Sequence, residues 1–209
     1  MRTVAWSVAV FAVVLGGCDR GTGGGGGEAA VAAAAGDGAT VVLVGYHSVS
    51  GKTKRLSLEV VEGAREVEGV RAVRKPIAEI TVDDLARADG LVLGGPTHYA
   101  NVPGEMMTVL SDWVWKRGVN LQDKVGGAFA TGGHLTGGKE HVVVSLLLYM
   151  LNNRMIVVGP IVKEGDGGYG ELGATAATSG DDAEWTEEEL AGARRLGARV
   201  ASVARRAKR

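Results

Sequence analysis

The hydrophobic pattern is clearest in an almost unbroken apolar run that begins at Thr40 and reads Thr-Val-Val-Leu-Val. Consecutive apolar and mostly β-branched positions predict a strand that is buried on both faces of a parallel sheet. A short polar loop at 48–53 follows this run, and the stretch 54–67 then places its apolar residues on one helical face. The pattern therefore predicts a strand, a loop of small residues and an amphipathic helix, in that order.

The same alternation continues along the chain. Further strands are predicted at 70–74, 91–93, 124–130 and 155–158, and helices at 83–88, 103–115, 140–152 and from 187 to about 206. Strands that alternate with helices at this spacing indicate an α/β fold with a parallel sheet. We expect a doubly wound, five-stranded sheet in the order 2-1-3-4-5 with helices on both faces. The glycine-rich stretch 165–180 has no periodicity, so we expect no regular element there.

The first loop has the residues of a phosphate site. A strand, a loop of small residues and a helix point backbone N–H groups and a helix N-terminus at an anion. The loop ends in Gly-Lys-Thr, as a nucleotide triphosphatase loop does, but Tyr46 stands where that motif needs its first glycine. Hydroxyls and amides that hold a terminal monophosphate are the better interpretation. The residues concerned are Ser48, Ser50, Gly51, Lys52 and Thr53.

Two more loops share this character. The segments after the third and fourth predicted strands, 94–101 and 131–138, are rich in glycine and threonine. In a doubly wound sheet, ligands bind outside the carboxyl ends of the strands, where the strand order reverses. A ligand with a monophosphate at one end and a ring system at the other fits these three loops. FMN fits better than a dinucleotide, because no G-x-G-x-x-G motif follows the first strand.

Composition narrows the function classes further. The chain has 209 residues and a formal net charge of -1, which fits one domain plus a tail and gives no electrostatic case for nucleic acid binding. It holds a single cysteine, so it can form neither an intrachain disulfide nor a cysteine metal cluster. The histidines His134 and His141 have no companions that would complete a metal site, and we expect no metal.

The first 17 residues have the pattern of a targeting signal, with Arg2 followed by an apolar run that is too short to span a membrane comfortably. The segment ends in Leu-Gly-Gly-Cys18, which resembles the bacterial lipoprotein signal. The resemblance implies cleavage before Cys18 and lipidation of that cysteine. An ordinary secretory signal or an uncleaved anchor is the alternative. The glycine- and alanine-rich stretch 18–38 would be a flexible tether, and 39–209 the folded domain. Asp19 favours the periplasmic face of the inner membrane, as in enteric-type lipoproteins.

The three loops together resemble those of a family. The first is similar to the flavodoxin-type phosphate loop, and the second, Pro-Thr-His-Tyr-Ala-Asn, is similar to the Pro-Thr-Arg-Phe-Gly-Asn segment of WrbA-type NAD(P)H:quinone oxidoreductases. The third loop resembles the Ser-Thr-Gly…Gly-Gly-x-Glu loop of the same enzymes, and 172–175 is similar to their late Tyr-Gly-Ala-Thr. The resemblance runs from Thr40 to about Ala204 and implies a flavodoxin-like fold.

The resemblance also implies an activity. Such an enzyme binds FMN and passes a hydride from NAD(P)H through the flavin to a quinone. The first loop would hold the phosphate, the second would border the isoalloxazine ring, and the third would meet its polar edge. The residues so assigned in the second and third loops are Pro96, Thr97, His98, Tyr99, Ala100, Asn101, Thr131, Gly132 and Gly133.

Two further residues are assigned by the resemblance alone. Trp115 lies within a residue of a family tryptophan that reaches a neighbouring subunit's flavin, so we expect it to contact substrate. Asn153, with Asn152, stands where the family has a histidine near the flavin. The chain also lacks an insertion after the second strand that contributes to tetramer contacts in the family. A homodimer or homotetramer is what the family implies.

Three functions remain open on the sequence. The first is an FMN-dependent quinone reductase tethered at a membrane through Cys18. The second is a flavodoxin-type electron carrier that does not itself oxidise NAD(P)H, although a net charge of -1 is unlike the strong acidity with which flavodoxins steer to their partners. The third is a non-redox module in which the first loop binds another phosphate ligand.

Overall fold

The structure, a computed structural model, describes residues 38–162, 170–177 and 184–208. These residues belong to the compact unit Ala34–Arg209. The strands are β1 (Thr40–Tyr46), β2 (Val70–Pro76), β3 (Gly90–Pro96), β4 (Val125–Gly132), β5 (Ile156–Val157) and β6 (Ala174–Ala177). The helices are α1 (Lys52–Arg65), the 3-10 turn η1 (Ile77–Glu79), α2 (Val82–Arg87), α3 (Gly104–Trp115), α4 (Lys139–Asn152) and α5 (Glu187–Ala207).

The strands form one parallel sheet in the order β2-β1-β3-β4-β5, with β6 paired to β4. The predicted order 2-1-3-4-5 is therefore confirmed. The place of the fifth strand is shared by two short pieces: β5 pairs with the start of β4, at Val125 and Gly126, and β6 pairs with its end, from Phe129 to Gly132.

One expectation for the last third of the chain is wrong. The stretch 165–180 was expected to hold no regular element, but Ala174–Ala177 within it is strand β6. Its sequence, Ala-Thr-Ala-Ala, contains no large apolar residue and therefore gives no strand signal on a propensity argument. The neighbouring β4 supplies the hydrogen-bonding edge that makes it a strand.

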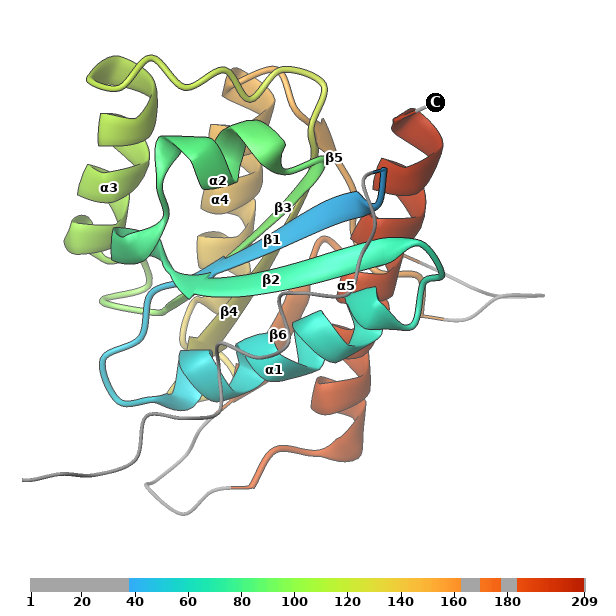
Figure 1. Cartoon of the computed structure of the whole chain (residues 1–209). Helices are drawn as coiled ribbons and strands as arrows, with labels where there is room; N and C mark the ends of the chain where they lie inside the picture. The colour runs from blue at the N-terminus through green and yellow to red at the C-terminus, as the bar shows by residue number, and fades with distance from the viewer. Residues whose placement is uncertain (1–37, 163–169, 178–183, 209) are drawn as a thin grey trace, which may run out of the picture. The chain divides into compact units, whose positions relative to one another are not determined.

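Helices cover both faces of the sheet (Figure 1), as the sequence predicts. One core lies between the sheet and α2, α3 and α4, and it includes Leu85, Trp113 and Leu146. The other lies between the sheet and α1 and α5, and it includes Leu56 and Leu196. Because β1 sends alternate side chains into each core, its apolar run is continuous.

Helices α1 and α5 lie side by side and very close together (Figure 1). A Cβ atom at Gly197 would lie 1.9 Å from the Val60 carbonyl oxygen, and one at Gly63 would lie 1.9 Å from the Arg194 carbonyl oxygen. Only glycine fits at these two positions. The Arg194 guanidinium also pairs with Glu59 across the contact at 2.6 Å. This packing fixes α1, whose N-terminus carries the first predicted loop.

Among the described residues, no helix combines the length and the apolar character that crossing a membrane requires. The predicted signal (1–17), Cys18 and nearly all of the predicted tether lie outside the described residues. The boundaries between signal, tether and domain therefore stay predictions.

Candidate functional site

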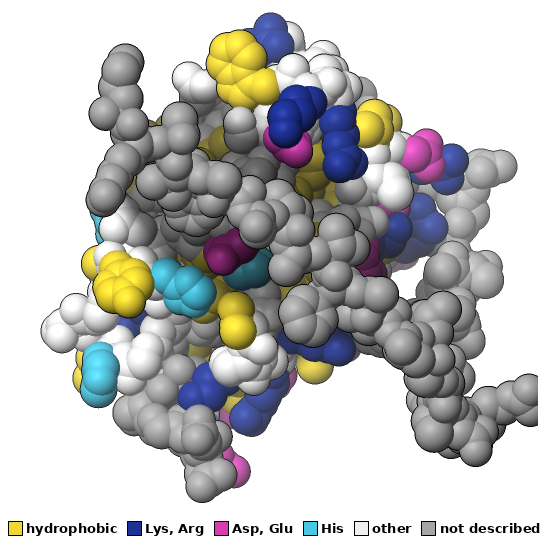
Figure 2. All heavy atoms as spheres, turned by 90° about the vertical axis from the view of Figure 1, so that its left-hand side faces the viewer, with side chains coloured by type: hydrophobic (Ala, Val, Ile, Leu, Met, Phe, Trp, Pro, Cys, Tyr) yellow, Lys and Arg dark blue, Asp and Glu magenta, His cyan; other side chains and the backbone are white. Residues whose placement is uncertain are grey.

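The three predicted loops leave the sheet at one edge, because β1, β3 and β4 are parallel and neighbouring. The first loop follows Tyr46, the last residue of β1, and the second and third loops begin in the last residues of β3 and β4, which end at Pro96 and Gly132. The strands run toward the left in Figure 1, and Figure 2 views that end directly. His side chains gather near the middle of this face together with an acidic side chain, and Lys and Arg side chains lie around them.

The first loop forms a cradle at the start of α1. Gly51 caps the helix with φ +85, a left-handed conformation that favours glycine, and no side chain from the part of the chain that the structure describes caps the first turn. The first N–H groups of a helix have no intrahelical partner, so they are available to an anion. Among the described residues, α1 has no acidic residue in its first turn to compete for this place. The Ser48 hydroxyl is buried and has no hydrogen-bond partner within residues 38–162, 170–177 and 184–208, so it is available to a ligand as well.

A buried hydrogen bond joins the first loop to the third. The hydroxyl oxygens of Thr53 and Thr131 lie 2.8 Å apart, and both residues are almost completely buried. The second loop joins the same point, since the backbone N–H and the hydroxyl of Thr97 donate to the Thr131 carbonyl at 2.8 and 3.0 Å. The three loops are thus tied together at Thr131.

The second loop is a tight hairpin turn. The backbone N–H groups of His98 and Asn101 donate to each other's carbonyls at 3.0 and 2.9 Å. The two central residues have positive φ, 49 at Tyr99 and 62 at Ala100, as a type I′ turn requires. The Asn101 side-chain amide donates to the Tyr99 carbonyl at 2.9 Å and stabilises the turn. The Tyr99 side chain is fully exposed at the tip, so it is free to lie against a ligand.

The third loop is held by a buried cation. Lys139, the first residue of α4, is 3% exposed, and its ammonium donates to the carbonyls of His134 at 3.0 Å and Leu135 at 2.6 Å. Gly138 has φ +92, and a Cβ there would lie 2.6 Å from the Cβ of Ala100. The second and third loops therefore fit against each other without a gap at this point.

A residue that the sequence did not single out also lies at this edge. The backbone N–H of His47 donates to the Gly94 carbonyl at 2.8 Å, so the chain just after β1 is fixed against β3. Its Nε2 atom is buried and has no hydrogen-bond partner among the residues that the structure describes. Burial lowers the pKa of His47 below its usual 6.5, against the opposing effect of the Glu105 carboxylate, and His98 lowers it further. The sequence motifs did not identify His47, because it stands immediately before the motif residues of the first loop.

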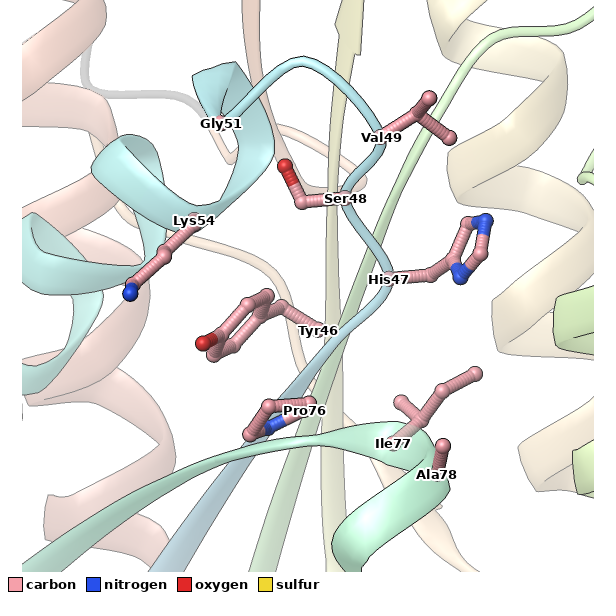
Figure 3. Close-up of a pocket in the computed structure, with 9 residues that line it drawn as sticks. All are labelled: Tyr46, His47, Ser48, Val49, Gly51, Lys54, Pro76, Ile77 and Ala78. Atoms are coloured by element: carbon pink, nitrogen blue, oxygen red, sulfur yellow. The ribbon is translucent and has the colours of Figure 1, made fainter. Parts of the chain in front are cut away.

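His47 and Ser48 also line a cavity of about 340 Å³ between the first loop and the end of β2. Figure 3 shows its arrangement: the Tyr46 ring and Lys54 lie on one side of the chain, and the His47 ring and Ile77 on the other. The Ser48 hydroxyl points toward Gly51 and the start of α1.

The structure brings most of the predicted residues together and leaves two apart. The three loops contain all of the predicted cofactor residues except Asn153. Asn153 follows the end of α4, where its amide donates to the Tyr149 carbonyl at 2.7 Å. Trp115 ends α3 and is 86% exposed. Both helices begin at the loops and run away from them, so in this chain neither residue reaches the three loops.

The chain is similar to proteins of known class. The family model for NADPH-dependent FMN reductase matches residues 30–166. A protein named NAD(P)H dehydrogenase (quinone) from Geotalea daltonii is 32% identical over 197 residues, which cover 78% of this chain and 96% of the relative. A protein named flavodoxin from Aquifex aeolicus is 34% identical over 160 residues, which cover 77% of this chain and 84% of the relative.

Solved structures agree with this assignment. The flavodoxin, WrbA-like protein from Agrobacterium tumefaciens superposes with a TM-score of 0.63 at 26% identity, over 80% of this chain and 99% of that chain. A flavodoxin from the domain Archaea has the same TM-score at 20% identity, a likeness of fold alone. The flavodoxin-like fold is thereby established. On the evidence of the matched family model and of relatives that align over most of its length, the chain belongs to the NADPH-dependent FMN reductase family.

Proposed function

We propose that the protein is an FMN-dependent NAD(P)H:quinone oxidoreductase. The observation that carries this proposal is the convergence of three loops on Thr131, beside a helix N-terminus at which Gly51, a residue without a side chain, is the cap. The cradle fits a cofactor with a terminal monophosphate, because the Ser48 hydroxyl is buried without a partner and Gly51 leaves the approach to the helix free of a side chain.

Each loop has a distinct part in binding. Ser48, Ser50 and the backbone N–H groups of Gly51, Lys52 and Thr53 hold the phosphate, since a helix N-terminus attracts an anion. The second loop, with Thr97, His98 and Tyr99, borders the ring. The third loop, Thr131 to Gly133, offers backbone groups to its polar edge.

Bound FMN supplies the hydride chemistry, and the protein supplies binding and orientation. The buried hydrogen bonds at Thr131 and the ammonium of Lys139 hold the loops in one arrangement before the cofactor arrives. Preorganised loops lose less conformational entropy on binding, and this favours affinity. The quinone acceptor is proposed from the names of relatives such as the Geotalea daltonii protein.

An electron carrier of the flavodoxin type is the second candidate. It is favoured by one observation, the 34% identity to a relative named flavodoxin. The two functions differ in a simple property: a reductase oxidises NADPH or NADH directly, and a carrier does not.

We also propose that Cys18 carries a lipid that tethers the domain to the periplasmic face of the inner membrane. The support is the signal-like sequence that ends at Cys18. The test is metabolic labelling with a fatty acid analogue, which should label the natural chain and not Cys18→Ala. Equal labelling of both chains would contradict the proposal.

We also propose a homodimer or homotetramer, which the resemblance to the WrbA-type enzymes implies. Trp115 is exposed and lies away from the loops of its own chain, so any substrate contact would be with the site of a second copy. Sedimentation velocity should show an oligomer. A monomer at micromolar concentration would leave Trp115 without a role in the site.

The proposed phosphate contact is tested with Ser48→Ala, and Ser111→Ala, an exposed serine on α3, is the matched control. Loss of one hydrogen bond to a charged phosphate should weaken FMN binding by about 10- to 100-fold. The control should bind FMN as the natural chain does. Unchanged affinity in Ser48→Ala would contradict the assignment of the first loop.

A further inference from the structure

His47 lies at the loop edge, and neither the motifs nor the proposed loop contacts give it a role. It stands between Tyr46, the last residue of β1, and Ser48, the first residue of the predicted phosphate loop. Its backbone is fixed by the hydrogen bond to Gly94 on β3. Figure 3 shows its ring on the side of the chain opposite Lys54, the same side as Ile77.

The His47 ring has an unmet need for a hydrogen bond. Nε2 is buried and unpartnered, whereas the large majority of buried polar side-chain atoms in proteins have at least one partner. Leaving such an atom unsatisfied costs about 1–3 kcal/mol. The adjacent Ser48 hydroxyl is in the same condition. Two neighbouring unsatisfied atoms beside a cavity indicate a place where a ligand completes the hydrogen bonding.

The charges around His47 keep its protonation adjustable. Glu105, in the first turn of α3, favours the charged imidazolium, while burial and His98 in the hairpin turn oppose it. From α1, Lys54 lines the same cavity on the other side of the chain. The turn η1 contributes only Ile77 and Ala78 to the lining. The effect of burial is the largest, so the pKa is lowered and the ring is neutral at pH 7. A second negative charge beside the ring would act together with the Glu105 carboxylate to favour the imidazolium.

We propose that His47 binds the cofactor through Nε2 and takes up a proton from solvent as the negatively charged cofactor binds. This inference rests on the proposed function, because it needs an anionic ligand in the loops. An anion close to the ring favours the imidazolium and raises its pKa in the complex. Binding of the proton then strengthens binding of the cofactor, and the reverse, so the affinity for the cofactor depends on pH.

The sign of the effect follows from linkage. If the pKa of His47 is higher in the complex than in the free protein, affinity is unaffected well above both values and rises as the pH falls through the value in the complex. Each unit of difference strengthens binding by about tenfold at the acid limit. FMN affinity should therefore increase between pH 8 and pH 5, the range in which histidine titrates.

The test measures FMN dissociation constants of the full chain by quenching of flavin fluorescence from about pH 8 to about pH 5. His47→Gln is the main variant, because a glutamine amide can still donate a hydrogen bond and does not titrate. The phosphate of FMN has its own ionisation near pH 6, so the two proteins are compared at each pH. The exposed His141→Gln on α4 is the matched control, since it removes one imidazole elsewhere.

The natural chain should gain about 3- to 10-fold more affinity than His47→Gln over this range, a difference that corresponds to a pKa rise of about 0.5 to 1 unit. His141→Gln should behave as the natural chain does. With four histidines in the sequence, the imidazole NMR signals can be assigned from these variants. The His47 signal should titrate at higher pH after FMN is added.

Two results would overturn the inference in distinguishable ways. If FMN binds and His47→Gln has the same pH dependence as the natural chain, His47 takes up no proton and the proposed function stands. If the natural chain binds no FMN at any pH, both proposals fail. Glu105→Gln gives a second check: removal of its charge should move the pH dependence to lower pH, and an unmoved curve would contradict the role of Glu105.

Discussion

Replacing Thr131 with valine should destabilise the protein although the two side chains have the same shape. The Thr131 hydroxyl shares its buried hydrogen bond, 2.8 Å long, with Thr53. Valine would leave the Thr53 hydroxyl buried without a partner, which costs about 1–3 kcal/mol. Valine is as good a strand residue as threonine, so propensity does not offset the loss at the end of β4.

The double variant separates this cost from any other. Thr53→Val alone should cost a similar amount, because it leaves the Thr131 hydroxyl buried without its hydrogen-bond partner. Thr53→Val with Thr131→Val replaces both partners by apolar groups of the same shape and should be nearly neutral. With a neutral double variant, the coupling energy between the two sites equals the sum of the two single costs, about 2–6 kcal/mol. It links residues that are 78 positions apart in sequence.

The assay is urea unfolding followed by circular dichroism, without FMN, because Thr53 is also assigned to the phosphate. Each kcal/mol should shift the midpoint urea concentration by about 0.3–1 M, because the slope for small proteins is about 1–3 kcal/mol per M. Additive single effects, with a coupling below about 0.5 kcal/mol, would refute the claim that this hydrogen bond ties the loops together.

Three further predictions concern stability. Ala100→Gly should raise stability by about 1 kcal/mol, because φ 62 is strained for alanine, and a lower unfolding midpoint in urea would contradict the assigned turn. Gly197→Ala should lower stability by about 1–3 kcal/mol even though alanine favours helices, because its Cβ would clash with the Val60 carbonyl; an unchanged midpoint would show that α1 and α5 can separate. Burial raises the pKa of Asp84, but hydrogen bonds from Lys75 and the helix cap outweigh it and hold the pKa below 3.8. Its contribution to stability is therefore present above about pH 4 and lost as the pH falls through the lowered pKa. Asp84→Asn should cost about 1 kcal/mol at pH 7, and its stability should fall less than that of the natural chain as the pH is lowered. Thermal melts from neutral to acid pH would show this difference.

The layout of the fold could be predicted from the sequence because its signals are local. The continuous apolar run of β1 requires burial on both faces, and the alternation of strands with helices leads to a parallel sheet. Strand β6 could not be predicted, since Ala174–Ala177 becomes a strand only through pairing with β4. The ends of several elements also differed by one to three residues from those expected, as at β3 (Gly90–Pro96).

The site was predictable only in outline. Gly, Ser and Thr in three loops indicated a phosphate-bearing ligand, but the hydrogen bond between Thr53 and Thr131 depends on the register of the sheet. The hairpin turn had no glycine to mark it, because Tyr99 and Ala100 occupy the positive φ positions. His47 became visible only when burial showed that its Nε2 has no partner.

The central claim is that the three loops hold FMN and present it to a nicotinamide donor. The most direct measurement is the absorbance spectrum of the purified full chain after incubation with FMN and desalting, followed by addition of NADPH or NADH under nitrogen. Retained flavin that is bleached by the nicotinamide is the predicted result. Retained flavin that ignores both donors would favour the electron carrier, and a protein that retains no flavin would contradict the account.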